Sequence, residues 1–179
     1  MSAYPAGSVE DREMLKKMGG EKLLDYFFLQ IRNLWRVDGL YFLGIEKKFG
    51  TEAATEVDAG VWEAMAEIEA KSLQRLFETG ENPDVATIMD LLRRSSWALD
   101  QPFKTTEISS KRAVLGVDRC RTQETRLSKG LEEFPCKRVR FGYLKNFAKT
   151  LNPNVRVTCL RCPPDKHPKD AWCKWEFTL

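Results

Sequence analysis

Apolar residues at helical spacing dominate the first half of the chain. Between residues 11 and 49 they recur at intervals of three and four, with one interruption at Gly19-Gly20. This periodicity predicts a long helix. Apolar residues also occupy its opposite side, so we expect the helix to be buried on more than one side. Gly50 is a natural stop for it, and Thr51 is expected to cap the next helix.

The pattern continues through two further helices. The second is expected at residues 52–78, and the third opens at Asn82-Pro83 with the asparagine as its cap. The inner face of the second helix is expected to contain Ala54, Val57, Val61, Met65, Ile68, Ser72 and Leu76. The inner face of the third is expected to contain Val85, Ile88, Met89 and Leu92.

After Trp97 the pattern changes to alternating and β-branched residues. Strands are expected at residues 103–109 and 112–120, and a short helix is allowed in the polar segment 121–130. A basic amphipathic helix follows at 136–151. A closing hairpin pairs residues 155–162 with 171–179.

This order predicts an α+β fold, with long N-terminal helices packed on a C-terminal antiparallel sheet of about four strands. The chain is interpreted as one domain, residues 1–179. Within it we distinguish a flexible arm at 1–9, a helical part at 11–96 and a sheet part at 97–179 that includes one helix.

Composition narrows the range of partners. The chain is 42% hydrophobic and 31% charged with a net charge of +3, which is too even a distribution to indicate nucleic-acid binding. No apolar run is long enough for a membrane span, and the N-terminus lacks a hydrophobic signal core. We therefore expect a cytoplasmic protein without nucleic-acid or membrane partners. Its five cysteines should be reduced there, which favours metal binding or catalysis over disulfides.

Three cysteines and the only histidine lie close together near the C-terminus, as Cys159, Cys162, His167 and Cys173 in the pattern C-x2-C-x4-H-x5-C. Four such ligands predict a zinc site. The alternative is a set of small buried side chains, because free cysteine is among the most buried residue types. In a simple hairpin Cys159 and Cys173 would lie opposite each other, both facing inward. The sequence leaves both interpretations open.

Cys136 is a second candidate for thiol chemistry. It lies at the expected start of a basic helix, where the helix dipole and neighbouring cations favour the thiolate. Tyr143 shares its inward face. Cys120 lies between Arg119 and Arg121, where the same argument holds more weakly. The alternative for each is a cysteine that only fills the core.

Asp38 lies on the most apolar face of the first helix, one turn from Trp35. A buried carboxylate must be paired or protonated, so Asp38 is expected to contact an arginine or a ligand. Arginines cluster in the second half of the chain, Arg119 among them. Their planar guanidinium groups are suited to binding a carboxylate or phosphate. A solvated basic face is the alternative.

The run NLWRVDGLYFLGIEKKFG at residues 33–50, followed by Cys120, Gly130, Cys136 and Cys173 with Trp175 and Phe177, resembles a known group. It is similar to a family of uncharacterised bacterial and archaeal cytosolic proteins related to L-2-amino-thiazoline-4-carboxylic acid hydrolase. More distantly, it is similar to vinyl-reductase-type small-ligand domains. The resemblance implies opening of a small sulfur heterocycle that bears a carboxylate, with Cys120, Cys136 and Cys173 as pocket thiols. Cys162 and His167 depart from that pattern.

These features favour a binding protein for a small anionic molecule. It could hydrolyse a C–N bond of a heterocycle with Cys136, Asp38 and Cys120 as catalytic residues and Arg119, Trp35 and Tyr143 as ligand-binding residues. The alternative is a non-catalytic sensor domain with structural zinc, so the residues leave enzymatic activity open. A third hypothesis, a partner-binding helical protein, requires an exposed apolar patch on the first two helices. A homodimer is compatible with each of the three.

Overall fold

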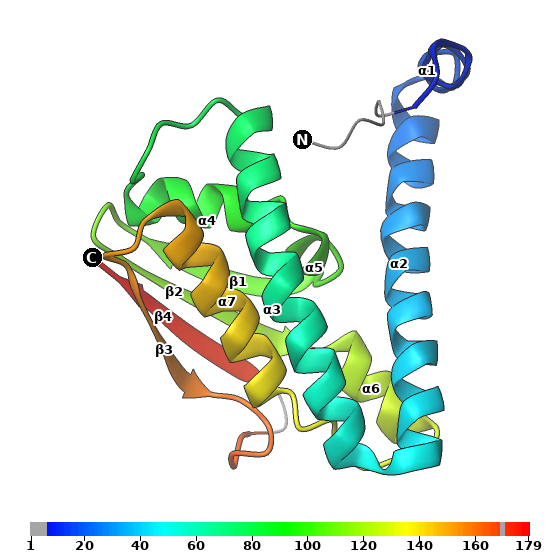
Figure 1. The fold of residues 1–179 in the computed structure, drawn as a ribbon, viewed down its shortest axis with the longest axis vertical. Coiled ribbons are helices and arrows are strands. Elements are labelled where there is room, and N and C mark those ends of the chain that lie inside the picture. Colours follow the sequence, from blue (N-terminus) through cyan, green and yellow to red (C-terminus); the bar gives the residue numbers. More distant parts are fainter. Residues whose placement is uncertain (1–6, 169–170) are drawn as a thin grey trace.

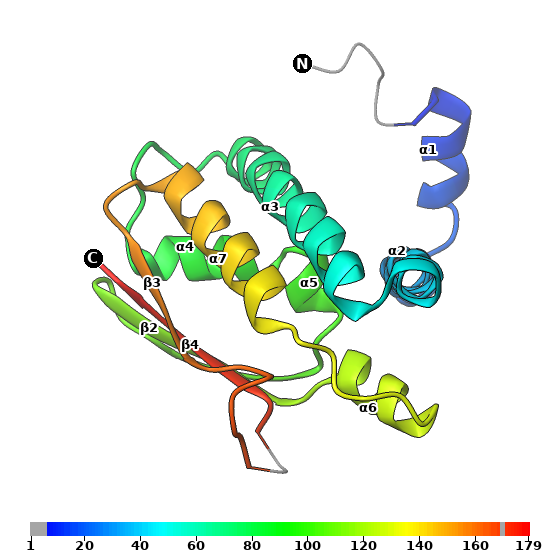
Figure 2. The ribbon, with the colours of Figure 1, turned by 60° about the horizontal axis from the view of Figure 1, so that its bottom comes forward.

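The chain forms a helical layer over one face of an antiparallel sheet (Figures 1 and 2). The computed structural model describes residues 7–168 and 171–179. The elements are α1 (Val9–Lys16), α2 (Gly20–Phe49), α3 (Thr51–Leu76), α4 (Val85–Arg93), α5 (Ser96–Leu99), β1 (Phe103–Ile108), β2 (Arg112–Arg119), α6 (Arg121–Ser128), α7 (Lys137–Leu151), β3 (Arg156–Arg161) and β4 (Cys173–Thr178). The α+β fold expected from the sequence is thereby confirmed.

The limits of several elements differ from expectation. Residues 1–6 of the expected arm lie outside the described residues, and Val9 already begins α1. Gly50 both ends α2 and caps α3 with a positive φ of 88°, a backbone conformation that glycine adopts without strain. Thr51 is therefore the first residue of α3, and its hydroxyl donates to Glu46. Asp84 caps α4 in place of the expected Asn82.

The sheet has the strand order β1-β2-β4-β3, with every neighbouring pair antiparallel. The closing hairpin is present, but its expected register is wrong. Cys159 lies opposite Trp175, and the pairing shifts between Cys159 and Arg161. This bulge places one extra residue in β3. As a result Arg161 pairs with Lys174, and the residues next to this pair, Cys162 and Cys173, approach each other.

The core lies between the sheet and the helices α3, α4 and α7 (Figure 2). Alternate residues of β4, Cys173, Trp175 and Phe177, are buried, as expected for a strand with one covered face. On α7, Tyr143 and Phe147 are completely buried.

The inner face of α3 agrees with the apolar pattern only at Ala54, which is buried, and at Met65, which is partly buried against the core. Its buried residues are Ala54, Thr55, Ala59, Trp62, Ala66 and Ala70. The expected inner residues Val57, Val61, Ile68 and Leu76 are exposed. Small side chains let α3 and α7 approach closely, to the point that a Cβ on Gly142 would clash with Glu63. Close packing against α7 therefore decides the orientation of α3, not the bulk of its apolar residues.

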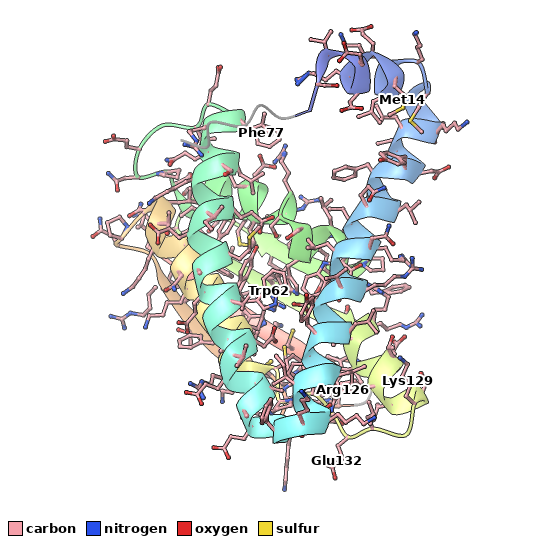
Figure 3. The ribbon with its side chains drawn as sticks, turned by 45° about the vertical axis from the view of Figure 1, so that its right-hand side comes forward. Met14, Trp62, Phe77, Arg126, Lys129 and Glu132 are labelled. Carbon is pink, nitrogen blue, oxygen red and sulfur yellow. The ribbon has the colours of Figure 1, made fainter. Side chains whose placement is uncertain are left out.

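The long helix α2 is buried far less than expected. Along this fully described helix only Trp35 and Phe42 are buried. It meets α3 near Gly50, and the two helices diverge toward the N-terminal end of α2 (Figures 1 and 3). The expectation of burial on several sides is wrong for the isolated chain. None of the described helices is both long and apolar enough to cross a membrane.

Replacing a leucine at the α7 core should unfold the protein more readily than replacing one on the surface. Leu144 is 0% exposed, and Leu144→Ala is expected to lower the free energy of unfolding by about 2–5 kcal/mol through lost burial and a residual cavity. Leu160 on β3 is 47% exposed, so Leu160→Ala should change it by about 0.5 kcal/mol or less. Urea denaturation followed by circular dichroism measures both, and equal effects would contradict the assigned core.

Candidate functional site

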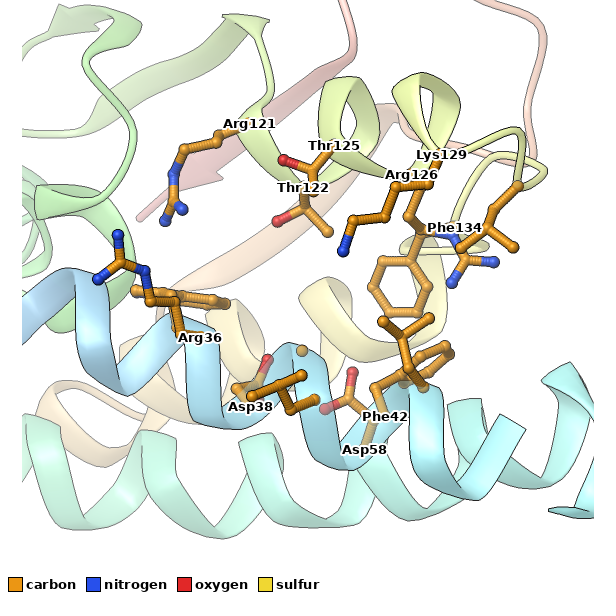
Figure 4. Close-up of a pocket in the computed structure, with 15 residues that line it drawn as sticks. Arg36, Asp38, Phe42, Asp58, Arg121, Thr122, Thr125, Arg126, Lys129 and Phe134 are labelled. Carbon is orange, nitrogen blue, oxygen red and sulfur yellow. The ribbon is translucent and has the colours of Figure 1, made fainter. Parts of the chain in front are cut away.

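A cavity of about 280 Å³ lies between α2 and α6, with α3 at its floor (Figure 4). Its walls are mainly apolar and include Trp35, Phe42 and Phe134. The Phe42 and Phe134 rings meet edge to face with centroids 4.9 Å apart. Apolar walls with a few polar groups are typical of small-ligand sites, and this volume suits a ligand of few atoms.

Two carboxylates from different helices form the polar floor of this cavity. Asp38 comes from α2 and Asp58 from α3 (Figure 4). The indole nitrogen of Trp62 donates to Asp38 Oδ1 at 3.1 Å and also hydrogen-bonds to Asp58. Trp62 stacks on Trp35 with centroids 4.7 Å apart, so an aromatic pair fixes the donor that both carboxylates share.

Arg140 of α7 lies behind the floor, and only 4% of its surface is exposed. Its guanidinium carbon is 4.5 Å from the Trp97 ring centroid, 5.1 Å from Tyr143, 5.4 Å from Trp62 and 5.8 Å from Trp35. These distances lie within the range of cation–π attraction. An arginine stays charged when buried, so this cation requires anions nearby.

Burial shifts the pKa values of both floor carboxylates, and the charge of Asp38 also shifts that of Asp58. Burial raises the pKa of Asp38, and the hydrogen bond from Trp62 and the charge of Arg140 oppose that rise. Burial and then the negative charge of Asp38 raise the pKa of Asp58 to about 7. Asp58 is therefore protonated below about pH 7 and about half protonated at pH 7, and Arg140 favours the charged form of both carboxylates.

Cations line the mouth of the cavity. The guanidinium groups of Arg36 and Arg121 extend toward each other from α2 and α6, and the Lys129 ammonium reaches over the floor (Figure 4). Arg121 also donates to the buried Asp100. Arg126 is already ion-paired, because two of its nitrogens donate to Glu46 at 2.9 Å. Among the described residues, Lys129 has no ion-pair partner and can bind an anion.

A cluster of thiols adjoins this site, assembled by two backbone contacts. The Lys137 amide donates to the Pro163 carbonyl at 2.8 Å, which brings Cys136 next to Cys162. The pairing of Arg161 with Lys174 brings Cys162 next to Cys173. Hydrogen bonds then link the Cys162 thiol to those of Cys136 and Cys173. Arg140 hydrogen-bonds to Cys136 and connects the cluster to the floor carboxylates.

The thiols of this cluster and of the two other cysteines differ in acidity. The hydrogen bond from Cys162 and then the charge of Arg140 lower the pKa of Cys136. The hydrogen bonds that Cys162 makes with Cys136 and Cys173 raise the pKa of Cys162. Burial raises the pKa of Cys120 to about 12, and it also raises the pKa of Cys159. Cys136 is therefore the one thiol of these four whose surroundings favour the thiolate.

The structure divides the four expected zinc ligands. Nδ1 of His167 bonds to the Pro168 carbonyl, its Nε2 lies 3.2 Å from Glu133 Oε2, and its ring packs on Trp172. Cys162 and Cys173 belong to the thiol cluster. Within residues 7–168 and 171–179, no group of three or more His, Cys, Asp or Glu side chains has an arrangement that could hold a metal ion.

The structure brings only part of the expected ligand site together. Asp38 and Trp35 line the cavity. Tyr143 lies behind it and donates to Glu69 at 2.7 Å, and Cys136 touches it only through Arg140. Arg119 lies outside, where it pairs with Glu124 and stacks on Phe103.

Sequence reasoning missed Asp58 as a site residue, and it gave Arg140 only as one of the cations near Cys136. The apolar pattern predicted Val57 on the inner face of α3. Asp58 is the next residue, so the same prediction placed Asp58 toward solvent. Arg140 follows Cys136 by four positions, a spacing that puts both side chains on one helix face. That spacing was the available signal.

A family model described as "Family of unknown function (DUF6125)" matches residues 16–179. This segment contains α2 to β4, and with them the cavity, the carboxylate pair and the thiol cluster. The curated proteins contain no match to the chain.

Replacing Asp58 by asparagine should remove a pH dependence of stability. The folded-state pKa of about 7 lies above the ordinary 3.8, so the folded protein holds a proton that the unfolded chain releases. The associated stability is complete below pH 4 and is lost as the pH rises through 7. At about 1.4 kcal/mol per pKa unit, the whole loss is on the order of 4 kcal/mol, of which about 3 kcal/mol falls between pH 5 and pH 8. Asp58→Asn, which mimics the protonated acid, should keep that stability at pH 8.

Urea denaturation at pH 5 and pH 8 measures the difference between the wild type and Asp58→Asn. The exposed Glu52, on the same helix, provides the matched control Glu52→Gln. A pH dependence that is the same in Asp58→Asn as in the wild type would contradict the raised pKa of Asp58.

Proposed function

The chain belongs to the DUF6125 family, and we propose that it binds a small anionic molecule in the cavity between α2 and α6 and hydrolyses a C–N bond of that molecule. One observation carries the proposal: a pair of carboxylates with shifted pKa values lies beneath a mouth lined by cations. Sites of this kind combine recognition of a charged group with proton transfer.

The mouth and the walls support binding of a compact anion. A carboxylate placed between Arg36, Arg121 and Lys129 would receive charge-assisted hydrogen bonds, which are roughly twice as strong as neutral ones. Its apolar or cyclic part would pack against Trp35 and Phe42. The volume of about 280 Å³ restricts the ligand to one small ring with its substituents.

The floor supports acid–base chemistry on such a ring. Asp38, held as a carboxylate by Trp62 and Arg140, accepts a proton from water while the water oxygen adds to the carbon of a C=N bond. Asp58, protonated up to about pH 7, donates its proton to the departing nitrogen. The C–N bond of the adduct then breaks: Asp38 returns its proton to the nitrogen, and the adduct's hydroxyl becomes a carbonyl and passes its proton to Asp58. One water has then been added, and both carboxyl groups are in their starting states. Two carboxylates whose environments separate their roles are a recurring solution for this task.

This assignment modifies the one implied by the resemblance to L-2-amino-thiazoline-4-carboxylic acid hydrolase. The thiols expected to line the pocket lie outside the cavity wall, and Cys136 reaches it only through Arg140. We therefore assign the attack to water and not to a thiolate. In this arrangement Cys136 positions Arg140, and Arg140 holds the charge of Asp38.

A non-catalytic ligand-binding domain is the second candidate. One observation favours it: Trp62 donates a hydrogen bond to Asp38, and the charge of Arg140 balances that of Asp38, so Asp38 needs no ligand as a partner. In that case the carboxylates would only neutralise the buried arginine, and the cationic mouth would still bind the anion.

Incubation with L-2-amino-thiazoline-4-carboxylate tests both candidates. We expect ring opening, seen by mass spectrometry as the gain of one water. Asp38→Asn should lower the rate about 10²–10⁴-fold, the usual contribution of a positioned base. The wild-type rate should fall as the pH rises through 7, because Asp58 then loses the proton that it donates.

Binding is measured separately by calorimetry. Lys129→Ala should weaken binding about tenfold or more, because a charged hydrogen bond is worth about 1.5–3 kcal/mol. Lys71→Ala, at an exposed lysine of α3 that pairs with Glu67, should leave binding unchanged. Binding without ring opening by the wild type would support the second candidate. Ring opening that persists in Asp38→Asn would refute the acid–base assignment.

A further inference from the structure

Helix α2 exposes more apolar surface than an isolated chain normally tolerates. Eleven of its large apolar side chains are between 36% and 72% exposed, while only Trp35 and Phe42 are buried. The helix stands at the edge of the molecule, with α3 along one side and open space along another (Figures 1 and 3). A helix that is apolar around most of its circumference is normally buried.

One stripe of these side chains has the spacing of a coiled coil. Its residues recur at alternating intervals of four and three along the helix. They are Leu23, Phe27, Gln30, Leu34, Val37, Tyr41 and Gly44, which we call the α2 seam. A mean interval of 3.5 residues keeps such a stripe in contact with a second helix over its whole length. The seam contains no charged residue. On the helix it lies apart from Trp35 and Phe42, which face the body of the chain.

The seam has a hollow at one end. A shallow depression over Gly44 is lined by Tyr41, Ile45 and Lys48, among others. Nothing lies within 4 Å of the position that a Cβ on Gly44 would occupy. The opposite end of the seam carries Leu23, a side chain of suitable size for this depression.

The exposed apolar area of α2 as a whole approaches that of one side of an interface. With side-chain areas on the order of 150 Å², the five large apolar side chains of the seam present on the order of 400 Å² of apolar surface, and the other six exposed ones on α2 bring the total to on the order of 800 Å². A standard interface buries about 800 Å² on each partner, so the seam supplies about half of one and side chains beside it must supply the rest. The seam alone is no larger than the largest apolar patch on a typical monomer, which covers about 300–600 Å². On α3, Val57, Val61 and Ile68 add a second exposed apolar stripe.

We infer that two copies of this chain pair through antiparallel α2 helices, with a two-fold axis that crosses the seam near Leu34. Leu34 then meets Leu34 of the second copy, and Tyr41 meets Phe27 of the second copy. At the ends, Leu23 of each copy fills the hollow over Gly44 of the other. The exposed face of α2 is thus the interface of a homodimer.

The self-complementarity of the seam favours a second copy over another protein. A two-fold interface uses the same patch on both partners, so each residue of the patch must fit the residue that it meets across the axis. Phe27 and Tyr41 each lie seven positions from Leu34, and Leu23 and Gly44 lie eleven and ten positions from it. The polar Gln30 faces Val37 of the second copy, where its amide reaches the interface edge.

Sedimentation equilibrium at micromolar concentrations tests the pairing. We expect a mass of twice 20.6 kDa for the wild type. Leu34→Glu should give the single-chain mass, because it places two carboxylates against each other at the axis. Leu29→Glu is the matched control. Leu29 and Leu34 are both leucines of α2, 47% and 43% exposed, but Leu29 lies off the seam, so Leu29→Glu should remain dimeric.

Circular dichroism of each variant confirms that the fold is retained. As a second measurement, mild oxidation of Leu34→Cys should yield a covalent dimer joined at position 34, located by peptide mass spectrometry against oxidised wild type. A monomeric wild type, or dissociation of both glutamate variants alike, would overturn the inference. Binding of the wild-type monomer to phosphatidylcholine vesicles would assign the exposed face to a lipid surface instead.

Discussion

The buried charge of Arg140 is the interaction on which the site depends. Its guanidinium group lies among three tryptophans and Tyr143, where water cannot solvate it. Such a cation is tolerated only beside anions, and its charge lowers the pKa values of Asp38, Asp58, Cys136 and Tyr143 relative to what burial alone would give. One side chain of α7 thereby fixes the protonation of the cavity floor and the acidity of the nearest thiol. The cavity and the thiol cluster form one connected polar network in an apolar surrounding.

Close packing of α3 against α7 gives this network its geometry. The alanines of α3 let the two helices approach, and that approach turns Asp58 and Trp62 toward α2 while it directs Val57 and Val61 to the surface. Close packing of this kind leaves few alternative arrangements, because a larger side chain would displace one helix. The same helix pair covers the sheet whose last hairpin supplies Cys162 and Cys173.

Helix α2 has two distinct sides. Its inner residues Trp35, Asp38 and Phe42 build the cavity, and its outer residues form the seam through which we infer dimerisation. A single rigid helix therefore connects the wall of the ligand site to the surface of the molecule. Pairing at the seam would therefore place the dimer interface on the same helix as the cavity wall.

The sequence by itself determined the elements and their order, because periodicity and helix-ending glycines are local signals. It also identified Asp38, whose charge in an apolar stripe requires a partner, and the inward alternation of β4. It could not identify that partner. Asp58 and Arg140 join the site only because α3 rotates onto its alanine face and α7 packs behind it. The hairpin register, the separation of His167 from the thiols and the exposure of α2 were likewise decided by the tertiary structure. Each depends on contacts between residues distant in the chain, and a local pattern carries no information about which distant surface will meet it.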